Sequence, residues 1–280
     1  MKTEFLSLSK KSDILAYLSE TKDVKIIAGG TDIIPQMRRG EVHCKTLLDI
    51  SQCNELNYIK QNSEHKICVG ALASHTDIYK NELIRKYGKI LSLACRKIGS
   101  TQIRNRGTIG GNIINCAICA DTIPALLVFD ADLVLESIRG TRNISIEKFF
   151  QKRDNWIKED ELLTEINFPI YPNTKYKMGW AKVGRREVMV MSRLSLAVVA
   201  VLEDRIVRMI RIASGACLAH FQRLYNVENF LLNKNLSNEL IQQSKRLISN
   251  ELIRIGGTRW STEYKEVVIG NLLERILRGL

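Results

Sequence analysis

Two short segments combine neighbouring glycines with hydroxyl, amide and carboxyl side chains. The first is Ile26-Ile27-Ala28-Gly29-Gly30-Thr31-Asp32-Ile33, and the second is Gly107-Thr108-Ile109-Gly110-Gly111-Asn112. Glycine lets the main chain turn through conformations closed to other residues, and it lets backbone N–H groups approach a ligand closely. The hydroxyl and amide side chains add further donors. The two segments could therefore hold the two phosphates of a dinucleotide; the alternative is that each is an ordinary glycine turn.

Two common nucleotide-binding motifs do not fit these segments. Neither contains G-x-G-x-x-G, the dinucleotide fingerprint of Rossmann domains, or G-x-x-x-x-G-K-[ST], the phosphate-binding loop of many nucleotide hydrolases. The sequence therefore gives no support to a Rossmann dehydrogenase or a P-loop enzyme. From the residues alone, the prediction stops at two phosphate-binding loops.

A Cys-x-x-Cys pair follows the second segment, at Cys116 and Cys119. Such a pair could be redox-active or could form half of a metal site. An iron–sulfur cluster usually needs four cysteines, and the sequence has no second pair. We therefore interpret both thiols as small packed residues and predict no metal site. The histidines show no metal-ligand spacing and are expected to be exposed or hydrogen-bonded; they are His43, His65, His75 and His220.

The elements that position these residues alternate between short strands and helices in the first part of the chain. The patterns predict strands at 24–28, 46–50, 66–69, 133–137 and 162–168, a helix that begins near 74, and helices over about 82–98 and 122–129. After a loop near 169–173, they predict strands at 176–183, 194–202 and 206–213 and helices near 226–233, 237–253 and 262–278. We therefore predict an α+β fold with domains at 1–172 and 173–280.

Composition excludes several classes of protein. Hydrophobic residues make up 45% and charged residues 26% of the 280 residues, which supports a buried core and argues against disorder. The net charge of +12 is scattered without a basic block, so we expect no nucleic-acid partner. No apolar run approaches the roughly 20 residues that span a bilayer, and the opening residues lack the apolar run of a signal peptide. Seven cysteines, an odd number, suit reduced thiols, so we expect a cytoplasmic protein without a membrane partner.

The glycine segments are part of a longer, ordered series of motifs. The series runs through 28–32, 102–112, 121–126, 162–164, 182–186 and 259–264. It resembles the FAD-binding (medium) subunits of the xanthine dehydrogenase and carbon monoxide dehydrogenase family of molybdenum hydroxylases over nearly the whole chain. The resemblance implies a PCMH-type FAD-binding domain in two parts, of the vanillyl-alcohol-oxidase and MurB-like type. A smaller C-terminal flavoprotein domain, α+β with a three-stranded antiparallel sheet and helices, would follow it.

The resemblance also implies which residues bind the cofactor. The first segment, 26–33, would wrap the FAD pyrophosphate, and 108–112 would contact it from the other side. Asp121 would accept hydrogen bonds from ribose or ribityl hydroxyls, because a carboxylate accepts two such bonds. Its alternative role is that of an N-cap for the helix that follows it.

Three further positions are implied to lie at the cofactor. Leu163 resembles a residue that contacts it, with plain strand core as the alternative. Lys182 resembles a basic residue that places positive charge near the flavin, with a solvated strand lysine as the alternative. Ile98 stands where relatives place a bulky or aromatic side chain against the cofactor.

By the same resemblance, the chain would be the FAD-carrying electron-transfer subunit of an (αβγ)₂ complex. Electrons from a molybdenum–pterin large subunit would pass through the [2Fe–2S] clusters of a small subunit to FAD, and then to an acceptor such as NAD⁺. The chain would thus be an oxidoreductase subunit without catalytic side chains of its own. Two alternatives remain, a stand-alone FAD-dependent oxidoreductase of the same fold and a non-enzymatic binding protein that has lost its cofactor.

Overall fold

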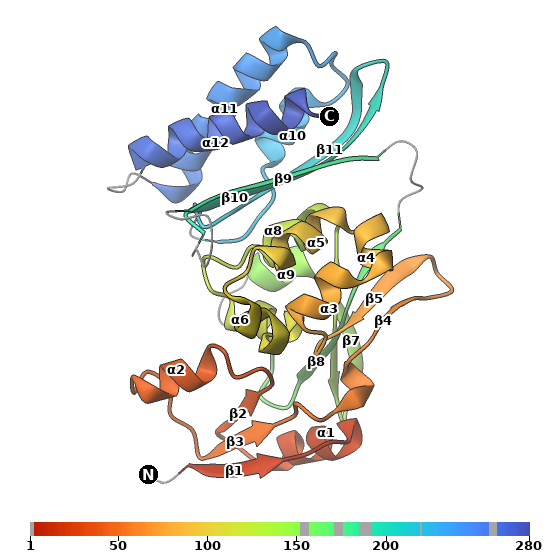
Figure 1. Ribbon diagram of the computed structural model, residues 1–280, viewed down its shortest axis with the longest axis vertical. Coiled ribbons are helices and arrows are strands. Elements are labelled where there is room, and N and C mark those ends of the chain that lie inside the picture. The colour runs from red at the N-terminus through yellow and green to blue at the C-terminus, as the bar shows by residue number, and fades with distance from the viewer. Residues whose placement is uncertain (1–2, 152–156, 171–175, 185–191, 219, 258–261) are drawn as a thin grey trace.

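The computed structural model describes residues 3–151, 157–170, 176–184, 192–218, 220–257 and 262–280. A small sheet lies at the N-terminal end of the long axis, and a second small sheet with its helices lies at the opposite end (Figure 1). A five-stranded sheet and a group of short helices fill the middle. The predicted α+β class is confirmed.

The N-terminal sheet has three parallel strands in the order β1 (Glu4–Ser7), β3 (Thr46–Asp49) and β2 (Val24–Ile27). Helix α1 (Lys11–Glu20) buries Ile14 and Leu18, which are four residues apart and therefore share one face. They pack with Leu48 of the central strand. Helix α2 (Ile33–Arg38) follows β2 and has no fully buried residue. The sheet thus fixes the point at which the first glycine segment begins.

The middle sheet is antiparallel, in the order β4-β5-β8-β6-β7. Its central strand β8 is almost entirely buried, whereas β6 alternates between buried and half-buried residues, as expected for a strand with one face on the core. The 3₁₀ helix η1 (Asn54–Leu56) precedes the first strand. The strands are β4 (Ile59–Gln61), β5 (Lys66–Gly70), β6 (Asp132–Ser137), β7 (Gly140–Ser145) and β8 (Leu162–Pro169).

Within the described part of the chain, seven short helices lie between the strands of this sheet in the sequence. The single helix predicted over 82–98 is wrong, because Gly88 takes a non-helical conformation and separates two helices. A side chain at Gly88 would press on the ring of Phe168, which lies 3.1 Å from the position of a Cβ. The helices are α3 (His75–Lys80), α4 (Glu82–Tyr87), α5 (Lys89–Arg96), α6 (Thr101–Arg106), α7 (Ile109–Asn115), α8 (Thr122–Val128) and α9 (Ile146–Gln151).

The C-terminal sheet has three antiparallel strands, β9 (Tyr176–Val183), β10 (Leu194–Glu203) and β11 (Ile206–Gly215), in the order β11-β10-β9. One face packs on the helices α10 (Tyr225–Leu231), α11 (Asn238–Gly256) and α12 (Thr262–Arg278), and the other face packs on the middle helices α5 and α8 (Figure 1). This is the predicted three-stranded antiparallel sheet with helices. The sheet therefore has one face available to build a site with the first part of the chain.

Parts of the predictions fall outside the described residues. These are the predicted boundary between residues 172 and 173, the end of the 182–186 motif and the beginning of the 259–264 motif. Among the described residues, no helix is both long and apolar enough to cross a membrane.

Candidate functional site

The first glycine segment is a turn between β2 and α2. Gly30 has a φ of +72°, which glycine adopts without the steric cost of a side chain, and this conformation redirects the chain after the strand. The backbone N–H groups of Gly30, Thr31 and Asp32 donate no hydrogen bond to any described residue. Three consecutive free amides at a turn form a concave set of donors that suits an anionic group such as a phosphate.

The second glycine segment lies directly against the first. A Cβ on Gly29 would stand 2.0 Å from the carbonyl oxygen of Arg106. A Cβ on Gly107 would stand 3.4 Å from the hydroxyl oxygen of Thr31. Gly29 is therefore needed for the close approach of the two segments, and the structure brings the two predicted phosphate-binding segments together.

The second segment is not the turn that the sequence suggested. Thr108 is the N-cap of α7, and its hydroxyl oxygen accepts a hydrogen bond of 3.1 Å from the Gly111 amide. Gly110 and Gly111 therefore lie in the first turn of a helix. A Cβ on Gly110 would meet Ala71 at 2.7 Å, so this glycine is needed for packing.

Most backbone amides of the second segment already donate within the protein. The Ile109 amide donates to the Ala73 carbonyl at 3.0 Å, and the Gly110 amide donates to the Ala71 carbonyl at 2.9 Å. The Asn112 amide donates to the Thr108 carbonyl at 3.0 Å. The segment can therefore offer a ligand the hydroxyl proton of Thr108 and the side-chain NH₂ of Asn112, but no cradle of free amides.

A third group of predicted residues gathers where the C-terminal sheet meets α5 and α8. The ammonium nitrogen of Lys182, on β9, lies 2.7 Å from Oδ2 of Asp121, at the beginning of α8. It also donates to the carbonyl oxygen of Lys97 at 3.2 Å, next to Ile98. The side chain of Lys182 is 11% exposed, so the alternative of a solvated lysine is wrong.

The carboxylate of Asp121 is buried. Its side chain is 2% exposed, and Oδ1 has no hydrogen-bond partner among the described residues. Asp121 occupies the N-cap position of α8, yet its side chain makes no capping hydrogen bond, so the alternative of a side-chain N-cap is wrong. The next residue, Thr122, donates its hydroxyl proton to Oδ1 of Asn112. This contact connects the ion pair to the second glycine segment.

Leu163 lies in the core. It is 3% exposed on β8 and is paired with Leu135 of β6. The carbonyl of the next residue, Thr164, accepts from the Ala71 amide, and the Ala71 carbonyl accepts from the Gly110 amide. The backbone of β8 is thus tied to the second glycine segment, while the side chain of Leu163 has the strand-core environment of its alternative reading.

The two thiols after α7, Cys116 and Cys119, are both half-buried. Cys116 has a φ of +46° at the C-cap of α7. Burial raises the pKa of the Cys119 thiol, and the negative charge of Asp121 raises it further. A protonated thiol is a poor nucleophile, so this environment opposes redox chemistry at neutral pH. Among the described residues, no group of three His, Cys, Asp or Glu side chains could hold a metal ion.

Three of the histidines are exposed, but His75 is buried beneath the second segment. Its backbone N–H donates to the Gly107 carbonyl at 3.0 Å, and its Nδ1 lies 3.7 Å from the sulfur of Cys95. Burial, and then the charge of Arg104, lower the pKa of His75 to about 4. At physiological pH His75 is therefore neutral, and it supports the second segment through its contact with Gly107.

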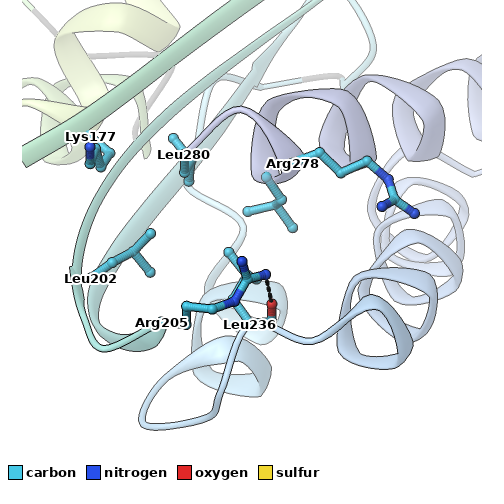
Figure 2. Close-up of a pocket in the computed structure, with 7 residues that line it drawn as sticks. Lys177, Leu202, Arg205, Leu236, Arg278 and Leu280 are labelled. Atoms are coloured by element: carbon cyan, nitrogen blue, oxygen red, sulfur yellow. Dashed lines mark hydrogen bonds between the residues drawn. The ribbon is translucent and has the colours of Figure 1, made fainter.

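A cavity of about 230 Å³ lies elsewhere, at the far end of the C-terminal sheet. Figure 2 shows Arg205, whose guanidinium donates to the Leu236 carbonyl at 2.7 Å, among leucine side chains that line the cavity. The cavity contains none of the residues predicted to bind a cofactor. It is lined by Lys177, Leu202, Arg205, Leu236, Leu277, Arg278 and Leu280.

The residues brought together fit a flavin dinucleotide. Free amides in the first segment suit a pyrophosphate, and the hydroxyl and amide side chains of the second segment can add donors. The buried ammonium of Lys182, which contacts the carbonyl of the residue before Ile98, supplies the charged group that the polar edge of a flavin ring can use. Sequence reasoning missed the Lys97 carbonyl and the pairing of Lys182 with Asp121, because no spacing rule connects residues so far apart in the chain.

Comparison with known proteins agrees with this assignment. Residues 1–171 match the family described as the FAD binding domain in molybdopterin dehydrogenase, and residues 180–280 match the CO dehydrogenase flavoprotein C-terminal domain. The nicotinate dehydrogenase FAD-subunit of Eubacterium barkeri is 28% identical, with 98% of this chain and 94% of that protein covered. The glyceraldehyde dehydrogenase medium chain of Sulfolobus acidocaldarius is 29% identical, with 92% of this chain and 90% of that protein covered.

A solved structure shares the fold. A chain of carbon monoxide dehydrogenase from Hydrogenophaga pseudoflava superposes with a TM-score of 0.90 at 24% identity, with 99% of this chain and 96% of that chain covered. At this identity the likeness establishes the fold.

Proposed function

The chain belongs to the FAD-binding family of molybdopterin dehydrogenases, and on that premise we propose that it passes electrons from an iron–sulfur partner subunit to an acceptor such as NAD⁺. Its cofactor is FAD, and it is an oxidoreductase subunit, as its relatives are. The observation that carries the proposal is the match of both family models, in order, to 1–171 and 180–280. Bound FAD would supply the redox chemistry, and the chain would bind it and set the charge around it.

The proposed cofactor site follows from the contacts. The free amides of 30–32 would hold one phosphate, and the remaining residues of 26–33 would shape this loop around the pyrophosphate. Thr108 and Asn112 would add side-chain donors from the other side, with Ile109, Gly110 and Gly111 fixing the helix that carries them. Lys182 and Ile98 would lie at the flavin, next to Asp121, and Leu163 would support the second segment from β8.

The proposed organisation has two domains, 1–172 for FAD binding and 173–280 for the C-terminal flavoprotein unit. Lys182 comes from the second unit and Asp121 from the first, so both units would contribute to the cofactor site. Neither unit alone would then bind FAD with the affinity of the whole chain.

The proposed partners are a molybdenum–pterin large subunit and a [2Fe–2S] small subunit, in an (αβγ)₂ complex in the cytoplasm. Relatives are named as an FAD-subunit or a medium chain, names that suit one member of a complex. The net charge of +12 also suits docking on acidic partners, and such docking weakens as salt rises.

Electron transfer is the direct test. The FAD-loaded chain is mixed anaerobically with the small subunit of the same complex, previously reduced with dithionite and freed of the excess reductant. We expect the flavin absorption to bleach and then to recover when NAD⁺ or another acceptor is added. A chain that ignores the reduced subunit but oxidises a small molecule alone would favour a stand-alone flavoenzyme. A colourless chain within the assembled complex would favour a binding protein that has lost its cofactor.

A further inference from the structure

Asp121 and Lys182 form a buried ion pair between the two parts of the chain. The ammonium of Lys182 reaches across from β9, and the carboxylate of Asp121 stands at the beginning of α8 (Figure 1 shows both elements). The two side chains are 11% and 2% exposed. A charge buried to this extent needs a partner, because an isolated one would lose its hydration without compensation.

The more exposed member of the pair is the lysine. Oδ2 of Asp121 is engaged by Lys182 at 2.7 Å, and Oδ1 is enclosed by protein. An ammonium has three N–H donors. One is directed at Asp121 and a second at the Lys97 carbonyl, which leaves the third for a group outside the pair. Lys182 is therefore the member of the pair that keeps a donor for a ligand.

The pair also fixes the charge that a cofactor would experience. The carboxylate offsets most of the ammonium's positive charge, so their combined effect is that of a dipole with its positive end outward. The thiols of Cys95 and Cys119 also interact with the charge of Asp121. Burial, and then that charge, raise the pKa of both thiols, so they are neutral near pH 7 and add no charge to the pair. The charge presented by Lys182 is therefore set mainly by Asp121.

We propose that Asp121 is a positioning residue that acts on the flavin through Lys182, by fixing both the place and the effective charge of the ammonium. This inference rests on the proposed function. It differs from a direct hydrogen bond between Asp121 and a cofactor hydroxyl in two ways. The two side chains shift the reduction potential of the flavin in opposite directions, and the shift caused by Asp121 depends on the presence of Lys182.

The test measures the reduction potential of bound FAD in Asp121→Asn, Lys182→Met and the double variant. Removing the carboxylate leaves an uncompensated cation, which favours the more negative, reduced flavin and raises the potential. Removing the ammonium leaves a carboxylate and lowers the potential. We expect the ratio of reduced to oxidised flavin at a fixed solution potential to change about tenfold or more in each direction, the size of effect that a nearby charge has on a protonation equilibrium.

The double variant decides whether the two residues act together. Because Asp121 acts through the ammonium, Asp121→Asn should move the potential less in the Lys182→Met background than in the wild type. Lys182→Arg, which keeps the charge, should deviate less than Lys182→Met. Lys177→Met is the matched control, because Lys177 is an exposed lysine on the same strand. It should leave the potential unchanged.

Potentials that shift in the same direction for both single variants, or effects that simply add in the double variant, would overturn the inference. The same holds if Asp121→Asn changes FAD affinity without moving the potential, the result expected of a direct hydrogen bond to a hydroxyl. A wild-type chain that binds no FAD in the assembled complex would instead reject the proposed function, so the two failures are distinguishable. If Asp121→Asn does not fold, Asp121→Glu, which keeps the carboxylate but displaces it, takes its place in the same set of variants.

Discussion

Gly29 and Arg106 are in backbone contact, so close that a Cβ on Gly29 would lie 2.0 Å from the Arg106 carbonyl oxygen. Gly29 follows β2, which ends at Ile27, and Arg106 is the last residue of α6, directly before the second segment. The contact determines how far apart the two segments stand. A ligand that spans both segments therefore depends on the absence of a side chain at this position.

Gly29→Ala should separate the two segments. The added methyl group cannot fit without a backbone shift, and overpacking of this kind costs about 1–3 kcal/mol of unfolding free energy. We expect FAD affinity to fall at least about tenfold, since a displacement of the phosphate donors costs at least one hydrogen bond. Gly256→Ala is the control, because its Cβ would meet its nearest neighbour, the Cys217 carbonyl oxygen, at an ordinary 3.5 Å. Equal FAD affinities in the two variants would contradict the prediction, which titration with FAD checks.

Gly30 and Gly40 form a second matched pair, since both have a φ of +72°. Alanine in this left-handed conformation costs roughly 1–2 kcal/mol, so Gly30→Ala and Gly40→Ala should lose similar unfolding free energies in urea. Only Gly30→Ala should weaken FAD binding, because strain at Gly30 would displace the free amides of residues 30–32, which would hold the phosphate. If Gly40→Ala weakens FAD binding as much, the effect reports strain in general and not the phosphate donors.

His75 should make stability depend on pH. The folded chain holds its pKa at about 4, against an ordinary value of 6.5, because the ring is buried and Arg104 is close. As the pH falls, His75 therefore binds a proton in the unfolded chain before it does so in the folded chain. The free energy of unfolding decreases between pH 6.5 and pH 4, by up to about 3 kcal/mol. Above 6.5 the residue contributes no pH dependence.

This loss is measured by urea unfolding across that pH range. His75→Asn should show a shallower decline than the wild type, and His220→Gln, at an exposed position, should retain the wild-type slope near pH 5. An unchanged slope in His75→Asn would show that other groups cause the decline.

Cys119 should react slowly with iodoacetamide at pH 7.5. Burial and the charge of Asp121 raise its pKa, so the thiolate that attacks the reagent is scarce. The rate should rise in Asp121→Asn, and mass spectrometry of the labelled peptide measures both rates. Labelling faster than that of an unfolded peptide of the same sequence would indicate an activated thiol and would revive the redox interpretation of the Cys-x-x-Cys pair.

The elements that the sequence predicted well are those with a strong apolar pattern. Strand β10 differs from its prediction by one residue at its end, because a long apolar run with several valines is buried on both faces. Strand β9 has the predicted bounds, although most of its residues are half-buried. Helix α6 was missed. It has no buried residue, and its one large apolar side chain, Ile103, is 40% exposed, so it produces no helical hydrophobic period.

For the site, the resemblance identified individual positions but not their contacts. Both glycine segments were predicted, yet α7 was not, because glycines at the beginning of a helix look like a turn when the N-cap role of Thr108 is not considered. Strand alternation fixes the face on which Lys182 lies. It does not indicate what is packed on that face, so the pairing with Asp121 required the structure.

The central claim is that this chain binds FAD, and the absorbance spectrum of the purified chain, before and after addition of FAD, tests it most directly. We predict a flavin spectrum that remains after removal of free cofactor, at one FAD per chain, with the released cofactor identified as FAD and not FMN. A chain that holds no flavin with excess FAD, and still holds none when co-expressed with both partner subunits, would contradict the account.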